Sequence, residues 1–175
     1  LVYYSAYSDA IDQIGATNQQ SAVDVTSADG ISVKLSALHC RYYFSHYESV
    51  MEELLPRIKQ LCLQAKSYNI GLSIDAEEAY RLEISLDVFA ALACDPDLEG
   101  WQGLGFVLQA YQKRAPDTAK WLIALAQKTN RRIMVRLVKG AYWDAEIKHA
   151  QELGLKGYPV FTRKANTDLC YQHCA

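Results

Sequence analysis

Long hydrophobic runs are missing from this sequence of 175 residues, and no apolar stretch approaches the length that a membrane-spanning helix needs. A surplus of basic charge is missing as well, because 18 Lys and Arg residues stand against 20 Asp and Glu residues. This balance, without any block of like charge, does not indicate binding to nucleic acid or to a membrane surface. The first residues contain no methionine and no basic region, so we expect no signal peptide.

Regular cysteine spacing is also absent. An odd number of irregularly spaced cysteines argues against a disulfide framework and predicts reduced thiols in the cytoplasm. Near the chain end, Cys170, His173 and Cys174 have a spacing that suits metal ligands on a helix. A closed zinc site needs four ligands, however, so we predict no metal site here. The five cysteines are Cys40, Cys62, Cys94, Cys170 and Cys174.

Several common signatures of catalytic sites do not occur. The sequence has no Walker loop and no G-x-S-x-G nucleophile motif. The glycines of residues 103–105 precede a strand, whereas a dinucleotide-binding loop follows one. The adjacent Glu77 and Glu78 are interpreted as acidic residues that favour a helix start. The isolated histidines are interpreted as surface or locally hydrogen-bonded residues: His39, His46 and His149.

What is present is a globular composition, with 50% hydrophobic and 22% charged residues, enough for one domain with a core. Short apolar stretches alternate with longer ones of helical spacing, which predicts βαβ units and a parallel sheet. We expect strands at residues 31–36, 70–75, 103–110 and 131–140. Helices are expected from about residue 45, over 77–94, from residue 117, and from 144 to 154.

Individual residues predict where these helices begin and end. Ser45 and Glu48 have the spacing of a capping box, and Pro56 is expected to bend the helix that follows. Asp117 is expected to cap the next-to-last of these helices. Gly15 is expected to end a helix that starts at the first residues.

The chain shows helical spacing from its first residues and a starting helix in its last ten. We therefore expect a piece of a larger protein; a natural short protein with frayed ends is the alternative. The predicted division has two parts. Residues 1–30 comprise the end of a helix and a polar connector over 16–30, and residues 31–175 form a partial barrel.

The strands predict a barrel more than an open sheet. One face of each strand is aliphatic, as in Ile31 and Val33, whereas the other is small or polar, as in Ser32 and Lys34. Helices on both faces of an open sheet would require two apolar faces. A (β/α)8 barrel of TIM type has its helices outside and its polar ends around a ligand, and four strands are half of one. Because a half barrel has two unpaired edges, we expect it alone to be marginal, oligomeric or supported by other segments.

Lys34, Asp75, Gln109 and Arg136 all lie near the carboxyl ends of their strands, which we call the mouth of the sheet. Barrel enzymes place their chemistry there. The alternative is a charge network, with Lys34 paired to Asp75 and Arg136 bonded to backbone. Lys and Arg suit an anionic substrate group, and a glutamine amide suits a heterocycle such as a flavin.

Five stretches carry a family resemblance: ISVKLSALH, IGLSIDAEEAYRLE, GLGFVLQAYQKR, RRIMVRLVKGAYWDAEIKHAQ and YPVFTRKANTD. From about residue 30 to its end, the chain resembles the proline dehydrogenase domain of bacterial proline utilization A, a bifunctional enzyme family. The resemblance implies a distorted (β/α)8 barrel with noncovalent FAD. It also implies oxidation of L-proline to Δ1-pyrroline-5-carboxylate, with electrons passed to a membrane quinone.

The resemblance further implies partners and a location. An aldehyde dehydrogenase module of the same polypeptide would convert the product to glutamate and so complete proline catabolism. DNA binding would require a further domain, which this chain lacks. The parent enzyme would be cytoplasmic and peripherally associated with the membrane during turnover.

The resemblance also assigns residues at the site. Lys34 would contact the proline carboxylate, Asp75 would lie at the same side of the pocket, and Arg136 would lie near flavin N5. Ala141 and Tyr142 would border the substrate. The remaining residues assigned to the cofactor would hold the flavin ring, the phosphates or the adenosine: Gln109, Val138, Lys139, Gly140, Trp143, Thr162, Arg163, Lys164 and Thr167.

The chain also departs from the family pattern. An arginine pair on the family's last barrel helix, which would grip the carboxylate, lies beyond the end of this chain. We therefore expect the 175 residues alone to be inactive and to retain FAD weakly. Two alternatives stay open: a barrel enzyme for an anionic substrate without flavin, and a noncatalytic structural piece.

Overall fold

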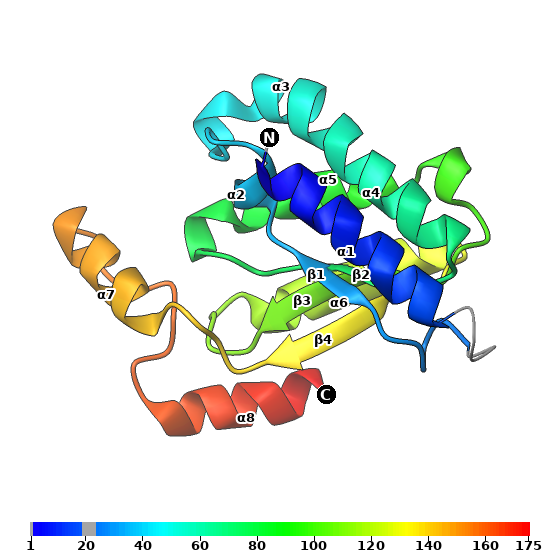
Figure 1. Ribbon diagram of the computed structural model, residues 1–175. Coiled ribbons are helices and arrows are strands. Elements are labelled where there is room, and N and C mark those ends of the chain that lie inside the picture. Colours follow the sequence, from blue (N-terminus) through cyan, green and yellow to red (C-terminus); the bar gives the residue numbers. More distant parts are fainter. Residues whose placement is uncertain (1, 19–23) are drawn as a thin grey trace.

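The computed structural model describes residues 2–18 and 24–175. Its strands form one parallel sheet in the order β1-β2-β3-β4, with helices connecting them (Figure 1). The strands are β1 (Ile31–Val33), β2 (Leu72–Ile74), β3 (Leu104–Gln109) and β4 (Met134–Val138). The predicted α/β fold is confirmed, with four consecutive βα units of the kind that build a (β/α)8 barrel.

The helices follow the strands, and Figure 1 shows α7 beyond the carboxyl ends of β3 and β4. The longer helices are α1 (Val2–Asn18), α4 (Leu55–Ser67), α5 (Leu82–Ala93), α6 (Ala115–Lys128), α7 (Trp143–Glu152) and α8 (Lys164–Cys174). The short ones are α2 (Leu35–Leu38), η1 (Phe44–His46), α3 (Tyr47–Ser49), η2 (Val50–Leu54), η3 (Ala79–Arg81) and η4 (Pro96–Leu98).

The register of the sheet puts residues of one kind at the same level. Val33 pairs with Ile74, and Ile74 pairs with Phe106, so aliphatic and aromatic side chains line one face. One residue further along β4, Arg136 pairs with Val107 on the opposite face. The predicted apolar face is therefore confirmed for β1 to β3, whereas Val135 of β4, on the same face, is 46% exposed.

The apolar face packs against the helices and forms the core. Phe106 contacts Phe89 of α5 edge-on, with ring centroids 5.1 Å apart. Burying each such side chain stabilises the fold by about 1.5–3 kcal/mol. On the outer side of this core, Ile11 of α1 is fully buried, consistent with the packing of α1 on α4.

The first predicted strand is shorter than expected. It ends at Val33, and residues 35–38 turn into the short helix α2. Leu35 and Leu38 are both buried in this turn, because a spacing of three residues brings them to one side. The prediction of a strand over 31–36 is wrong in its second half.

The predicted helix starts at Ser45 and Asp117 are also wrong. Ser45 lies inside η1 and forms no capping bond, and the following helix has His46 at its N-cap. Asp117 lies in the first turn of α6, whose N-cap is Arg114. An acidic side chain in the first turn interacts favourably with the helix dipole without capping, which explains its position.

Pro56 disturbs its helix through a π-helical turn. The N–H of Leu55 bonds to the carbonyl of Val50, five residues back, at the end of η2. Proline lacks an N–H and its ring collides with the carbonyl four residues earlier, so a wider turn before it relieves the clash. The expected effect of Pro56 is therefore found as a change of helix type.

Gly15 does not end the first helix, which continues to Asn18. A Cβ at Gly15 would overlap the ring of Tyr68, so the glycine permits close packing of α1 instead. Gly154 does follow α7 with a φ of 61°, as predicted for a helix end. The predicted connector over 16–30 falls partly outside the described residues. The division at residue 30 stays a prediction.

Candidate active site at the mouth of the sheet

Asp75 and Arg136 are joined at the mouth. Arg136 of β4 reaches across β3, and its Nη2 donates to Asp75 Oδ1 at 2.6 Å. Ser32 Oγ donates to the same oxygen at 2.7 Å. The expected alternatives, an ion pair between Lys34 and Asp75 and a backbone bond for Arg136, are both wrong. Because the Arg136 side chain is 54% exposed, this pair orients charge more than it stabilises the fold.

Lys34 is a cation without a carboxylate partner within ion-pair distance in the described residues. Its Nζ lies 5.9 Å from the centroid of the Tyr142 ring. The pKa of Lys34 is raised, chiefly by interaction with the Tyr142 hydroxyl and further by Asp75 and Glu77. Lys34 therefore keeps its positive charge at neutral pH, and this charge is available to an anion at the mouth.

Gln109 holds three elements together through its side-chain amide. Its Nε2 donates to the carbonyl of Glu77 at 2.8 Å, and its Oε1 accepts from the N–H of Ala141 at 3.0 Å. These partners fix which end of the amide carries the nitrogen. One N–H and one lone pair remain for a further partner, and the side chain is buried.

Glu77 belongs to this site, although the sequence suggested only a helix-start role. Its carboxylate accepts from the N–H of Ser36 at 3.0 Å and from Arg81 Nη1 at 2.6 Å. The side chain is buried. The signal was limited to sequence position, since Glu77 follows Asp75 by two residues in the segment after β2.

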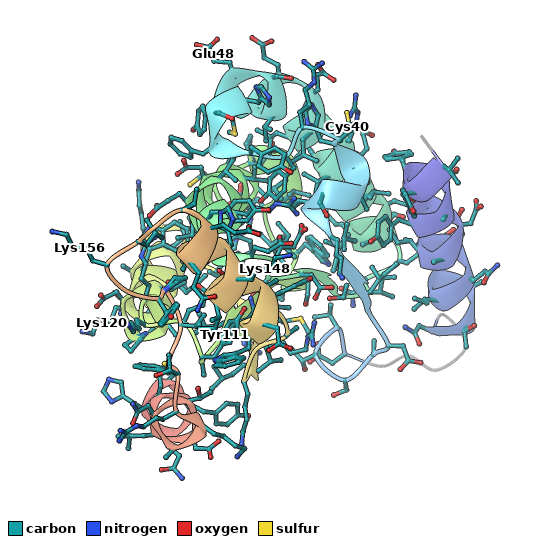
Figure 2. All side chains as sticks on the ribbon, turned by 90° about the vertical axis from the view of Figure 1, so that its left-hand side faces the viewer. Cys40, Glu48, Tyr111, Lys120, Lys148 and Lys156 are labelled. Atoms are coloured by element: carbon teal, nitrogen blue, oxygen red, sulfur yellow. The ribbon has the colours of Figure 1, made fainter. Side chains whose placement is uncertain are left out.

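A second group of predicted residues surrounds one hollow of about 350 Å³, which we call the α7–α8 hollow. Two aromatic residues that the sequence did not indicate, Tyr111 and Phe161, also line it. Figure 2 shows Tyr111 between α7 and α8. The predicted cofactor residues that line the hollow are Lys139, Gly140, Trp143, Thr162, Lys164 and Thr167.

Backbone bonds between distant segments build the walls of this hollow. Tyr111 donates its N–H to the carbonyl of Lys139 at 2.7 Å and accepts from the N–H of Phe161 at 2.8 Å. The indole N–H of Trp143 donates to the carbonyl of Phe161 at 2.9 Å. These bonds bring the loop after β4 and the segment before α8 against the end of β3.

Gly140 lets the loop after β4 approach Tyr111 closely. Its φ is 141°, a conformation that side-chain-bearing residues rarely adopt. A Cβ at this position would overlap the Tyr111 ring. The glycine is therefore required for the shape of the α7–α8 hollow.

Positive charge gathers beside the start of α8. Lys139 and Lys164 both donate to Asp168, at 2.6 and 2.9 Å, and these bonds lower the pKa of Asp168. The first turn of α8 contains no acidic residue, and its N-cap residue, Arg163, forms no side-chain capping bond. Free N–H groups and nearby lysines at a helix start suit a phosphate group. Asp168 was not predicted, although its spacing of four residues from Lys164 typifies a helical ion pair.

The remaining predicted residues lie near these groups without joining them. Arg163 is exposed and does not line the hollow. Val138 pairs with Gln109 in the sheet, and Ala141 contacts Gln109 only through its backbone. The roles of all these residues stay predictions.

Within residues 2–18 and 24–175, no group of three His, Cys, Asp or Glu side chains is placed to hold a metal ion. No helix in the described part of the chain is both long and apolar enough to cross a membrane. Of the isolated histidines, His39 is buried and accepts from the N–H of Arg41 at 3.2 Å, which confirms a local role.

The fold and sequence are similar to those of proline utilization A proteins with solved structures. A structure of a proline utilization A variant from Bradyrhizobium japonicum matches with a TM-score of 0.95 and 53% identity, covering 98% of this chain and 18% of that one. The structure of proline utilization A from Bdellovibrio bacteriovorus, an enzyme inactivated by N-propargylglycine, matches with a TM-score of 0.89 and 26% identity, covering 98% of this chain and 19% of that one.

Curated sequences agree with these structures. The bifunctional protein PutA of Salmonella typhimurium is 56% identical over 173 residues, which are 99% of this chain and 13% of that protein. The chain thus spans a small part of the relatives it matches. The model of the family described as proline dehydrogenase matches residues 1–175. The chain therefore belongs to the proline dehydrogenase family.

Proposed function

We propose that the protein carrying this chain oxidises L-proline to Δ1-pyrroline-5-carboxylate with FAD as its cofactor. The observation that carries the proposal is the arrangement at the mouth, where Lys34, which has no ion-pair partner among the described residues, stands near the pair formed by Asp75 and Arg136. Membership of the proline dehydrogenase family supports the same reaction.

The mouth has the charges that an amino acid requires. Lys34 would bind the proline carboxylate, since its charge has no carboxylate partner within ion-pair distance in the described residues. Tyr142, which stands beside Lys34, would border the proline ring and orient the lysine. Asp75 would hold Arg136 in place through the 2.6 Å contact. No nucleophilic side chain is needed, because the reaction removes a hydride and a proton from the substrate.

The residues present fit FAD by their donors. When bound, FAD accepts the hydride from the substrate carbon. Gln109 would contact the flavin ring through its remaining N–H and lone pair, and Arg136 would place positive charge near the ring. Lys139, Lys164 and the start of α8 would bind the phosphates. Trp143, at the start of α7, would help to hold the flavin, while Gly140, Thr162 and Thr167 would complete the wall of the hollow.

The other partners follow from the same family. We propose a membrane quinone as the electron acceptor, which requires a cytoplasmic enzyme to visit the membrane surface during turnover. We also propose an aldehyde dehydrogenase module in the same polypeptide, which would consume the hydrolysed product.

The test uses the complete protein that carries this chain, purified with FAD and freed of oxygen. Adding L-proline should bleach the visible flavin absorbance, because the reduced flavin absorbs little there. Bound flavin that stays oxidised would contradict proline as the substrate, and hydroxyproline would be tried next. A protein without flavin would overturn the cofactor and the residue roles that depend on it.

Inactivity of the 175 residues alone stays a prediction. Proline-dependent dye reduction by the isolated chain tests it, and a rate near that of the complete protein would contradict it. Gel filtration with FAD measures retention in the same preparation, for which we expect weak binding.

A further inference from the structure

A separate cavity of about 480 Å³ lies between η3, the loop at Tyr43 and α7. None of its residues has a role in the site described above. Two tyrosines, two carboxylates and a histidine dominate its wall. The lining residues are Tyr43, Glu78, Tyr80, Ala145, Glu146 and His149, and we call this space the Glu146 cavity.

The aromatic side of the Glu146 cavity suits a cation. The rings of Tyr43 and Tyr80 are nearly parallel, with centroids 5.9 Å apart, and the His149 ring lies 5.3 Å from that of Tyr80. The faces of tyrosine rings carry negative electrostatic potential, which attracts cations. These rings already contact one guanidinium, since Arg81 Cζ lies 5.2 Å from Tyr43 and 5.4 Å from Tyr80.

The acidic side contains a buried carboxylate with an unused oxygen. Glu146 is only 3% exposed, and its Oε1 accepts from the N–H of Ala79 at 2.5 Å. No hydrogen bond joins its Oε2 to another group in the part of the chain that the structure describes, and this oxygen is not fully buried. This oxygen is therefore open to a donor in the cavity, and a charge-assisted hydrogen bond to it would be favourable.

Glu78 adds a second carboxylate that is incompletely satisfied. Its Oε2 is buried and lies 3.1 Å from Arg81 Nη1, without the geometry of a hydrogen bond. Arg81 is already shared, because the same Nη1 donates to Glu77. Glu77 and Glu78 thus share the one guanidinium of Arg81, while the carboxylate of Glu146 lines the same cavity as Glu78 without an ion pair in the described residues, which leaves an excess of negative charge at the cavity.

We propose that the Glu146 cavity binds a guanidinium group. A guanidinium presents several N–H donors in one plane, which pair with carboxylates, and the same plane stacks on aromatic rings. Alkali and alkaline-earth cations instead require several oxygen ligands, which this wall of rings does not provide. The group has two sources, a small guanidino compound or an arginine side chain of the complete polypeptide. This inference does not depend on the proposed reaction.

The experiment titrates the complete protein with methylguanidinium chloride at constant ionic strength. Binding is followed by calorimetry and by the NMR signals of the His149 ring. We expect saturable binding, with methylammonium at least several-fold weaker because it lacks the planar donor set. Equal binding of the two cations would overturn the guanidinium assignment.

Two variants and a matched control locate the binding. Glu146→Gln keeps an acceptor for Ala79 and removes the charge, so affinity should fall by about tenfold, the usual value of a charge-assisted bond. Tyr80→Leu removes an aromatic ring and should also weaken binding of methylguanidinium. If Glu146→Gln does not fold, Tyr80→Leu tests whether the binding site is the Glu146 cavity. Glu152→Gln, on the same helix in an exposed pair with Lys148, should change nothing.

The outcome also separates the two sources. Binding that is lost in Glu146→Gln but kept in Glu152→Gln supports a small guanidino ligand. Absence of binding, together with a crystal structure of the complete protein that shows its own arginine in the cavity, supports the polypeptide as the source. Absence of both binding and an arginine would overturn the proposal.

Discussion

The helix-facing side and the mouth of the sheet satisfy their residues in different ways. On the helix-facing side, Val33, Ile74 and Phe106 are at most 1% exposed and need only neighbours of suitable shape. At the mouth, Asp75 and Arg136 need specific partners, and the arginine stays half exposed. Apolar packing carries the stability of the sheet, whereas paired charges at the mouth carry its chemistry, so the two can be changed separately.

The largest effect should come from the helix-facing side. Phe106→Ala removes a buried ring that contacts Phe89, and such changes cost about 3–5 kcal/mol. Arg136→Met at the mouth should cost less than about 1 kcal/mol, because exposed ion pairs contribute little. Urea unfolding of both variants measures the difference. Similar losses for the two would contradict the separation of the faces.

Gly140 tests the shape of the α7–α8 hollow. Gly140→Ala places a side chain at a φ of 141° and into the Tyr111 ring, so it should cost about 1–3 kcal/mol and reduce FAD retention. Gly154→Ala is the matched control, since its φ is also positive but no atom stands within 4 Å of the added Cβ. Thermal melting and the flavin content after gel filtration are measured. FAD loss in both variants would show that the overlap with Tyr111 is irrelevant.

The pair at the mouth should set the flavin potential. Arg136→Met removes positive charge near the proposed ring and should lower the two-electron potential by about 30 mV, which corresponds to about 1.4 kcal/mol. Asp75→Asn removes the opposite charge and should raise it. The flavin potentials of both variants are measured by dye equilibration. An unchanged potential in both variants would show that the pair of Asp75 and Arg136 does not set it.

The smallest effect concerns pH and Glu146, a buried charge outside the core. Burial raises the pKa of Glu146 from its ordinary value of 4.5, the charge of Glu78 adds to this, and the Ala79 N–H and His149 oppose it. The folded state thus binds this proton more tightly than the unfolded state. The free energy of unfolding should fall as pH rises through the raised pKa.

Glu146→Gln isolates this contribution. Relative to the variant, the unmodified protein should lose stability between the ordinary pKa of glutamate and the raised one. Asp168 has a lowered pKa and acts with the opposite sign, but it is present in both proteins and cancels. Urea midpoints across pH give the difference, and parallel curves would rule the effect out.

Much of the fold was predictable because its signals are local. Alternation along each strand identified the apolar and polar faces, and the order of elements identified a parallel sheet. Helix ends were less predictable. Gly15 looks like a stop signal in sequence, but it is a packing position against Tyr68, which lies far away along the chain.

Which side chains bond to one another at the site was less predictable than which residues belong to it. Lys34 and Asp75 follow neighbouring strands, which suggested that they pair, yet Arg136 crosses β3 to reach Asp75. Tyr111 and Phe161 were missed because their contact joins segments without any shared pattern. Sequence periodicity reports which way a side chain faces, whereas the partner depends on the length and path of side chains from other elements.

The backbone contact between Tyr111 and Phe161 bears on how fast this part of the chain opens locally. It is accompanied by an isolated bridge between Gln112 and Val160, by a bond from the Lys113 N–H to the Pro159 carbonyl and by the Trp143 indole bond, whereas Leu72 lies within a continuous ladder. A segment held by so few bonds can open locally while the sheet stays intact. The amide of Phe161 should therefore exchange with solvent before that of Leu72, although both hydrogen bonds measure 2.8 Å. Local opening of the segment around Phe161 would then expose the α7–α8 hollow. The rate of this opening would limit how fast a large ligand enters.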